Sequence, residues 1–303
     1  MTDFLPEGHR IGSEENRLYT ESLDGLRRAM EEETLLEARA TLCDRGTELR
    51  FSFGGIEGVM PRDEVAVTED DEPIRDIAVI CRVGKPSVFC VEYVEEGARP
   101  RIHLSRRRAQ EKCLREYLDR LEEGDIIPAR VTHFEPFGAF CDIGCGIPSL
   151  LSIDCISVSR ISHPSDRFRI GEDILAAVKT RDERRLGQRG RIALTHKELL
   201  GTWQENADRF QIGQTVIGIV RSIESYGIFV ELAPNLAGLA EWKEGVRVGD
   251  GCAVYIKNII PQKMKVKLVL IDTFRLNGEE KKFEYFQKEG SVRGFSYPPQ
   301  ASE

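Results

Sequence analysis

The sequence predicts a mainly β protein, built from tandem five-stranded barrels that are joined by short α-helices and preceded by an N-terminal helix. Three observations support this prediction. Short runs of alternating apolar and polar residues recur along the chain between Gly-rich turns, as in half-buried strands. Segments with helical spacing separate these β-rich stretches. The β-rich stretch that begins at Gly124 recurs from Gly213 with a constant offset of 89 residues over its first half, which indicates a duplication.

Length and composition point to a globular protein with two or three domains. The chain has 303 residues, is 41% hydrophobic and contains no apolar run long enough to span a membrane. Its N-terminus lacks the basic start and apolar stretch of a signal peptide, so we expect a cytoplasmic location. The eight cysteines are scattered, mostly inside apolar runs, which is typical of buried, reduced thiols.

The charge distribution matters more than the net charge. The formal net charge of −8 argues against a nucleic-acid binder. Acidic residues, however, concentrate in the N-terminal segment and at Glu69–Glu72, whereas basic residues cluster at Arg99–Arg115, Lys179–Lys197 and Lys257–Lys267. Because a local field attracts phosphate, these clusters are either phosphate-binding patches or solvated faces.

Residues 1–34 are predicted to form an acidic helical segment. Leu23, Leu26 and Met30 fall at helical spacing, and Thr20 is a suitable N-cap. The segment would pack on the next domain or act as a docking helix, and its narrow apolar stripe favours packing. Residues 35–105 are predicted to form the first β unit. Its six expected strands are Leu35–Leu42, Glu48–Phe53, Gly58–Met60, Ile77–Val83, Val88–Tyr93 and Arg101–Leu104.

Two helices are expected to link three β units. Residues 106–122 carry one apolar stripe opposite a basic face, and residues 196–211 begin at a capping box that Thr195 forms with Glu198. The second unit then covers 123–195 and the third 212–272. Residues 273–303 form a polar tail, in which Phe283, Tyr285 and Phe286 are expected to dock on the third unit.

The second and third units share an aromatic motif. Phe137-Gly138 and Phe140 match Tyr226-Gly227 and Phe229, and Ser149-Leu150 matches Gly238-Leu239. The second unit carries extra residues around Ile161–Pro164 that the third lacks. The first unit fits the frame loosely, with Gly58-Val59-Met60 at the place of Ser149-Leu150-Leu151 and Leu104 at that of Leu194, but it has no aromatic pair. Small units of five short strands suggest the Greek-key OB barrel.

With its Phe-Gly-Ala-Phe-x-Asp-Ile-Gly run, the small-Leu-Leu turn and the closing Arg-Ile-Ala-Leu-Thr, the second unit resembles the RNA-binding domain of bacterial small-subunit (30S) ribosomal protein S-one. The third unit matches well, and the first resembles a degenerate copy. The resemblance covers roughly residues 35 to 272, and the arrangement is similar to the short three-domain S-one-like proteins of Gram-positive bacteria.

This resemblance implies an RNA-binding face on each complete barrel. The family uses two aromatics, a His, an Asp and an Arg. In the second unit they correspond to Phe137, Phe140, Ser152 in place of the His, Asp182 and Arg191. In the third unit they correspond to Tyr226, Phe229, Glu241 in place of the His, Asn258 and Lys267. The absence of the aromatic pair implies that the first unit binds RNA weakly or serves in docking.

The residue types agree with this implication. Aromatic rings among cations on a small sheet stack on unpaired bases of any sequence, and Lys and Arg neutralise phosphates. Arg130, His133 and Arg221 lie near the aromatic residues in sequence and are further candidates. The alternative for Phe137 and Phe140 is packing in a core.

Neither a metal site nor an active site is expected. Cys141, Cys145 and Cys155, with His133 or His163, could be drawn as a zinc cluster, but their spacing lacks a second close pair. No cofactor motif is complete, and the three β units leave no room for a catalytic core.

The sequence therefore predicts a non-catalytic, cytoplasmic protein that binds single-stranded RNA or mRNA, without a small-molecule substrate or membrane partner, near the 30S ribosomal subunit. The alternatives are a ribosome-independent regulator of transcript stability or transcription, and a protein-docking adaptor.

Overall fold

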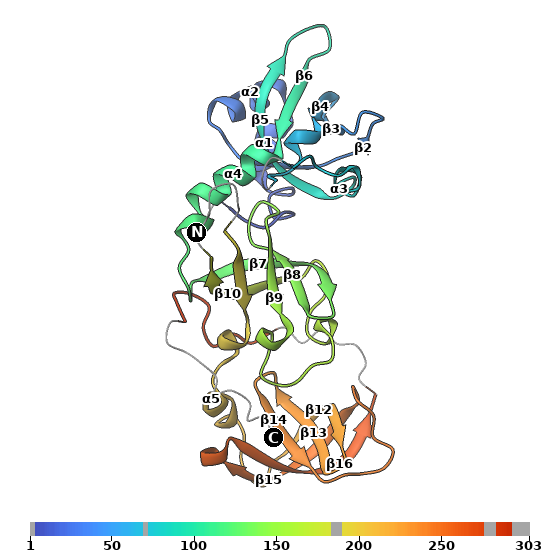
Figure 1. The fold of residues 1–303 in the computed structure, drawn as a ribbon, viewed down its shortest axis with the longest axis vertical. Helices are drawn as coiled ribbons and strands as arrows, with labels where there is room; N and C mark the ends of the chain where they lie inside the picture. The colour runs from blue at the N-terminus through green and yellow to red at the C-terminus, as the bar shows by residue number, and fades with distance from the viewer. Residues whose placement is uncertain (1–3, 69–71, 183–189, 276–282, 293–303) are drawn as a thin grey trace.

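The computed structural model describes residues 4–68, 72–182, 190–275 and 283–292. Three β units follow one another along an elongated molecule, with the first at the top of Figure 1 and the third at the bottom. Two of them are closed five-stranded barrels, so the predicted mainly β fold of tandem barrels is confirmed. Among the described residues, no helix combines the length and the apolar character that a membrane span requires.

The first unit is a six-stranded sheet in the order β1-β5-β6-β4-β3-β2. Only Ala40 and Thr41 separate its two end strands, so β1 and β2 act as one interrupted first strand and the chain itself joins the ends of the sheet. The strands are β1 (Leu36–Arg39), β2 (Leu42–Cys43), β3 (Leu49–Phe53), β4 (Ile56–Met60), β5 (Pro86–Glu95) and β6 (Arg101–Ser105).

The N-terminal segment contains two helices, α1 (Glu14–Thr20) and α2 (Leu23–Glu31), rather than one. Their N-caps are Ser13 and Ser22, and the hydroxyl oxygen of each accepts a hydrogen bond from a backbone N–H in the first turn. The predicted cap, Thr20, instead ends α1, and its hydroxyl donates to Asn16 O. Leu26 and Ala29 are fully buried in the core of the first unit, which confirms packing for this face of α2.

One predicted strand is wrong. Residues Asp76–Ile80 form the short helix α3, where a strand was expected over Ile77–Val83. Only Val79 is buried, while Ile77 and Ile80 point into solvent. A short apolar run between loops does not distinguish a strand from a helix by its periodicity.

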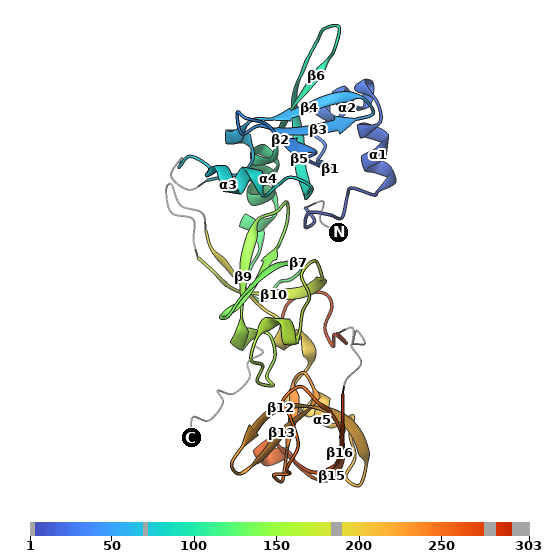
Figure 2. The same cartoon turned by 90° about the vertical axis from the view of Figure 1, so that its right-hand side faces the viewer.

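The second and third units close completely. In both barrels, counted along the chain, the strands follow the cyclic order first, second, third, fifth, fourth, and the interrupted ring of the first unit follows the same order. Figure 2 shows the third barrel nearly end-on as a ring. The second barrel contains β7 (Ile126–Glu135), β8 (Gly138–Asp142), β9 (Pro148–Ser152), β10 (Asp173–Arg181) and β11 (Ile192–Thr195). The third contains β12 (Thr215–Glu224), β13 (Gly227–Ala233), β14 (Leu236–Ala240), β15 (Gly251–Ile260) and β16 (Lys265–Phe274).

Short helices connect the units. Helix α4 (Arg106–Glu116) begins at the N-cap Ser105 and continues into a 3-10 turn, Leu118–Arg120. The second connection is not the single helix that was predicted. It consists of a 3-10 turn, Lys197–Leu200, and helix α5 (Trp203–Ala207), whose capping box is Thr202 with Glu205. Gly201 interrupts it with a φ of 79°, a conformation that favours glycine.

The extra residues of the second unit join it to the third. Residues 153–172 lie between β9 and β10, whereas only 241–250 lie between the corresponding β14 and β15. From this longer connection Arg167 pairs with Glu231 of β13, at 2.7 Å between Nη1 and Oε1, and both side chains are 5% exposed. Ser159 N donates to Pro234 O and Val158 N to the side chain of Asn235.

The N-terminal segment joins the first unit to the second. The buried Glu7 carboxylate accepts hydrogen bonds from Arg106 Nε at 2.6 Å and Arg82 Nη2 at 2.7 Å, and from Val88 N. Its own backbone N–H donates to Asp142 of β8 at 2.7 Å. Burial alone would raise the pKa of Glu7, but Arg106 and Arg82 hold it below its ordinary value.

Phe283 and Tyr285 of the tail dock on the second barrel, not on the third as expected. The ring of Phe283 lies 4.7 Å from that of His196 and 5.4 Å from that of Phe168. The hydroxyl of Tyr285 accepts a hydrogen bond from Leu175 N, and Ser291 forms an isolated bridge with Asp125. Phe286, the third predicted ring, is 42% exposed and lies at the connection between the second and third units, where its backbone N–H donates to Leu199 O and Arg209 lies 5.8 Å from its ring.

Candidate nucleic-acid interface

The second barrel presents three clustered rings on its outer surface. Phe137, in the turn between β7 and β8, is 54% exposed, and Phe140 in β8 is half-buried. The ring of His133 stacks on Phe140 at 4.5 Å with an interplanar angle of 5°, and Phe137 meets Phe140 edge to face at 6.3 Å. Neither phenylalanine is in the buried core, so the exposed face of Phe137 is available to a flat partner.

Gly138 explains why the motif places a glycine between these rings. A Cβ at this position would lie 2.5 Å from the carbonyl oxygen of Leu151 on the neighbouring strand, so only glycine allows β8 and β9 to approach. Ile153 N also donates to Phe137 O at 2.9 Å and fixes the turn. Phe137 is therefore displayed by a backbone that is held on both sides.

The third barrel repeats the ring pair without the histidine. Tyr226 is 60% exposed and meets the half-buried Phe229 edge to face, with ring centroids 6.1 Å apart. Gly227 has the same role as Gly138, because its Cβ would lie 2.5 Å from the carbonyl oxygen of Ala240. Ser222 pairs with Phe229 at the place where His133 pairs with Phe140.

Strand pairing defines one outer row of five residues across each unit. The second unit's row is His133, Phe140, Leu150, Ala193 and Thr180. The third unit's row is Ser222, Phe229, Leu239, Lys267 and Asn258. The first unit's row is Leu42, Arg50, Val59, His103 and Tyr93, of which Val59 is buried. The rows confirm that Val59 and Leu104 correspond to Leu150 and Leu194.

The rows correct one predicted correspondence. Asp182 and Arg191 form a cross-strand pair, with Asp182 N donating to Arg191 O at 2.9 Å, but they lie two residues beyond the outer row. Asn258 and Lys267 lie within the row. The register counterparts of Asp182 and Arg191 are Ile260 and Lys265 in the third unit, and Glu95 and Arg101 in the first. Equal separations of nine residues in the sequence hid a difference in hairpin length.

Lys265 is thus a candidate that the sequence comparison missed. Arg191 lies three residues before the buried Leu194, and Lys265 lies three residues before the buried Leu268. An alignment on these leucines therefore matches Arg191 with Lys265. The side chains of Lys257, Lys265 and Lys267 are exposed, and within the described ranges none of them forms an ion pair. This part of β15 and β16 is a basic surface, and Leu239 separates its Lys267 from Phe229 in the row.

The two predicted arginines at the first strands are occupied by carboxylates. Arg130 binds Asp173 through Nε at 2.7 Å and Nη2 at 2.8 Å, and this hydrogen bonding raises the pKa of the guanidinium. Arg221 binds Glu231 at 2.8 Å with only 12% of its side chain exposed. Both arginines contribute to packing beside the barrels, and the structure does not bring them into the ring clusters.

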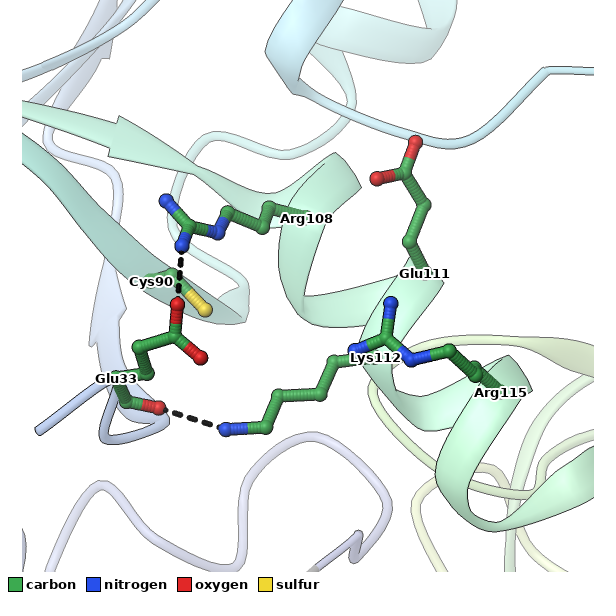
Figure 3. Close-up of a pocket in the computed structure, with 6 residues that line it drawn as sticks. All are labelled: Glu33, Cys90, Arg108, Glu111, Lys112 and Arg115. Atoms are coloured by element: carbon green, nitrogen blue, oxygen red, sulfur yellow. Dashed lines mark hydrogen bonds and ion pairs between the residues drawn. The ribbon is translucent and has the colours of Figure 1, made fainter.

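The basic cluster on α4 is likewise neutralised. Arg106 binds Glu7, Arg107 binds Glu64 and Glu111, and Arg108 binds Glu33 and Glu92. Figure 3 shows the pocket beside this helix, in which the Glu33 carboxylate meets Arg108 and its carbonyl oxygen meets Lys112. The other lining residues are Cys90, Glu111 and Arg115. Most cations of the basic cluster Arg99–Arg115, which the sequence suggested as a phosphate-binding patch, are therefore paired with carboxylates of the protein itself.

Buried groups around the second barrel have structural roles. Asp142 accepts hydrogen bonds from Glu7 N, Gly144 N and Gly146 N, and burial together with nearby Glu7 raises its pKa to about 6. Burial raises the pKa of Cys141 to about 12, which keeps that thiol protonated. In the ranges that the structure describes, no three His, Cys, Asp or Glu side chains are placed to hold a metal ion.

The remaining candidates lie around the rows. Ser152 pairs with Gly138 and is half-buried, whereas Glu241 is exposed. Lys179 and Lys197 donate to Cys155 and to the carbonyl oxygen of Asp154, respectively. Residues 183–189 of the second basic cluster and 69–71 of the acidic run lie outside the described residues.

Comparison with known proteins agrees with this geometry. Residues 120–197 match the family model described as S1 RNA binding domain. The chain is 32% identical over 196 residues to the small ribosomal subunit protein bS1 of Rhodopseudomonas palustris, covering 63% of this chain and 32% of that protein. It is 29% identical over 189 residues to bS1 of Leuconostoc lactis, covering 57% and 43%. The resemblance to the ribosomal S-one family is therefore confirmed at the level of the S1 RNA-binding domain.

One relative carries the name of an enzyme. The chain is 30% identical over 213 residues to the 4-hydroxy-3-methylbut-2-enyl diphosphate reductase of Clostridium tetani, covering 67% of this chain but 31% of that protein. The chain spans about a third to two fifths of the length of these curated relatives. A match to under a third of the reductase does not transfer its named activity.

Proposed function

We propose that the second and third barrels bind single-stranded RNA, mRNA above all, without catalysing a reaction, and that the chain does so on the small ribosomal subunit. The observation that carries the proposal is the exposed ring cluster of His133, Phe140 and Phe137, repeated in part as Tyr226 and Phe229. The S1 match over 120–197 and the ribosomal relatives support it. A cytoplasmic location follows from the same proposal.

The chemistry of the surface favours unpaired bases. A base in a duplex presents its edge, whereas an unpaired base presents a flat face that stacks on an aromatic ring for roughly 1–3 kcal/mol. Lys267, in the same row as Phe229, and Lys265 supply positive charge for the phosphates. This combination binds with little sequence preference and weakens as salt concentration rises.

The experiment is a titration of a fluorescent single-stranded RNA with the full chain at two salt concentrations. We expect the double variant Phe137→Ala/Phe140→Ala to bind at least about tenfold more weakly, because two stacking contacts are lost. Ile170→Ala is the matched control, since Ile170 is a 65% exposed apolar residue of the same unit outside the row. Equal affinity of the double variant and the control would contradict the proposal.

A ribosome-independent regulator of transcripts is the alternative within the same class. Sedimentation of cell extract at low salt separates the two. Under our proposal the chain migrates with the 30S subunit and larger particles, and the double variant is released from mRNA-bearing particles. A chain that binds RNA in the titration but stays at the top of the gradient would be a free regulator.

A further inference from the structure

The first unit has a ring pair of its own. It lies at the end of the row opposite to the places that His133 and Phe140 occupy in the second unit. Tyr93 of β5 and His103 of β6 are directly paired, and their rings stack at 4.0 Å with an interplanar angle of 10°. Tyr93 is 52% exposed. In the second unit the same two places in the row hold Thr180 and Ala193, so the sequence motif gave no sign of this pair.

Carboxylates gather around Arg50 along the row that contains this ring pair, and one further carboxylate lies beside the rings. Arg50, which occupies the place of Phe140, is bound by Asp44 at 2.6 Å, Glu48 at 2.9 Å and Glu57 at 3.5 Å. Their side chains remain between 26% and 44% exposed. Glu95 lies 3.4 Å from His103, with 55% of its side chain exposed. One guanidinium thus faces three carboxylates, and a fourth lies beside the rings.

The cation at the place of Arg191, which would neutralise phosphate on an RNA-binding face, is paired with a carboxylate in the first unit. Arg101 has the register place of Arg191, but its Nε lies 3.0 Å from the Glu57 carboxylate. The imbalance extends over the N-terminal segment and the first unit together. Residues 1–105 contain 23 Asp and Glu against 13 Lys and Arg, whereas residues 106–303 contain 28 against 30. A phosphate backbone approaching the first unit would be repelled, and a cationic chain would be attracted.

We propose that this face of the first unit, formed by Tyr93, His103, Asp44, Glu48, Glu57 and Glu95, is a docking surface for an arginine- and lysine-rich polypeptide segment. An exposed tyrosine ring attracts a guanidinium or ammonium group over its face, and nearby carboxylates add charged hydrogen bonds. The proposal is independent of RNA binding by the other two barrels. It assigns a different partner to an equivalent surface of a duplicated fold.

The probe is a fluorescein-labelled peptide of alternating Arg and Gly, titrated with the full chain at physiological salt, with a peptide in which Gln replaces each Arg as reference. We expect Tyr93→Ala to weaken binding roughly two- to fivefold, which is the range of an exposed cation–π contact. Adding Glu57→Gln and Glu95→Gln should bring the loss to roughly tenfold. The RNA affinity of Tyr93→Ala should equal that of the wild type.

A control with the same change of charge separates a specific face from general attraction. Glu14→Gln/Glu15→Gln removes two exposed negative charges from α1, a helix that carries no residue of the proposed face, and should leave peptide binding within twofold. Equal losses in this control and in Glu57→Gln/Glu95→Gln would overturn the proposal, as would absence of Arg-dependent binding by the wild type. A loss of RNA affinity in Tyr93→Ala would instead make the ring pair a base-stacking site.

Discussion

The first and second units share a strand order and a register but distribute rings and charges in opposite ways. On the outer row the second unit shows His133 and Phe140, where the first shows Leu42 and Arg50. The flank differs in the same sense, since the first unit is sealed by the Glu7 ion pairs and the second by the rings around His196. Inward residues maintain the shared barrel, so outward residues are free to select different partners.

Breaking the charged seal of the first unit is expected to have the largest effect. Glu7→Gln leaves Arg106 and Arg82 buried without a carboxylate, which should lower the free energy of unfolding by about 3–5 kcal/mol. Chemical denaturation at pH 7 measures this loss. Glu14→Gln, an exposed change on α1, is the control and should stay within about 0.5 kcal/mol of the wild type. A cost below about 1 kcal/mol for Glu7→Gln would show that the flank does not depend on this pair.

The ring seal of the second unit should respond to acid. Burial lowers the pKa of His196 to about 4, with Arg167 adding to the shift. Because the unfolded histidine titrates near about 6.5, its stabilising effect is complete above that pH and is lost as pH falls toward the folded pKa. Between pH 7.5 and 5 this amounts to about 2 kcal/mol. Denaturation curves at these two pH values measure it.

His196→Gln provides the comparison for that acid response. The variant is less stable at every pH, but the part of the pH dependence due to His196 should disappear, so wild type and variant should converge toward pH 5. If the difference between them is the same at pH 7.5 and at pH 5, the imidazole does not carry the response.

The smallest expected effect concerns a position beside the row. Ser152 is half-buried beside Gly138, at the position where the S-one resemblance implies a histidine. Ser152→His should strengthen single-stranded RNA binding roughly two- to fivefold by adding a ring to the cluster, a modest part of a full stacking contact. The RNA titration measures this gain. Ser152→Asn is the control for size and polarity, and an equal gain with Asn would exclude stacking.

The sequence allowed prediction of features that are set locally or repeated. The aromatic-Gly-x-Phe motif, the constant offset and the alternating runs gave the barrels and the exposed pairs Phe137 with Phe140 and Tyr226 with Phe229. It could not predict pairings between distant segments. No sequence pattern around Glu7 indicates that it pairs with Arg106, 99 residues away. The docking of Phe283 on the second barrel likewise requires the chain to turn back after the third barrel, which no local pattern predicts. The sequence motif did not reveal the ring pair Tyr93 and His103, because this pair lies on the fourth and fifth strands of its unit and the motif covers the first two.

The buried contact of Arg167 with Glu231 has a consequence for how tightly RNA is held. This ion pair and the adjoining hydrogen bonds fix the third barrel against the second. The two ring clusters therefore form one bivalent binding surface for RNA. A strand that has bound one cluster meets the other at an effective concentration set by the protein, not by the solution. Oligonucleotides long enough to engage both clusters should therefore gain avidity, and shorter ones should bind with the affinity of one cluster alone.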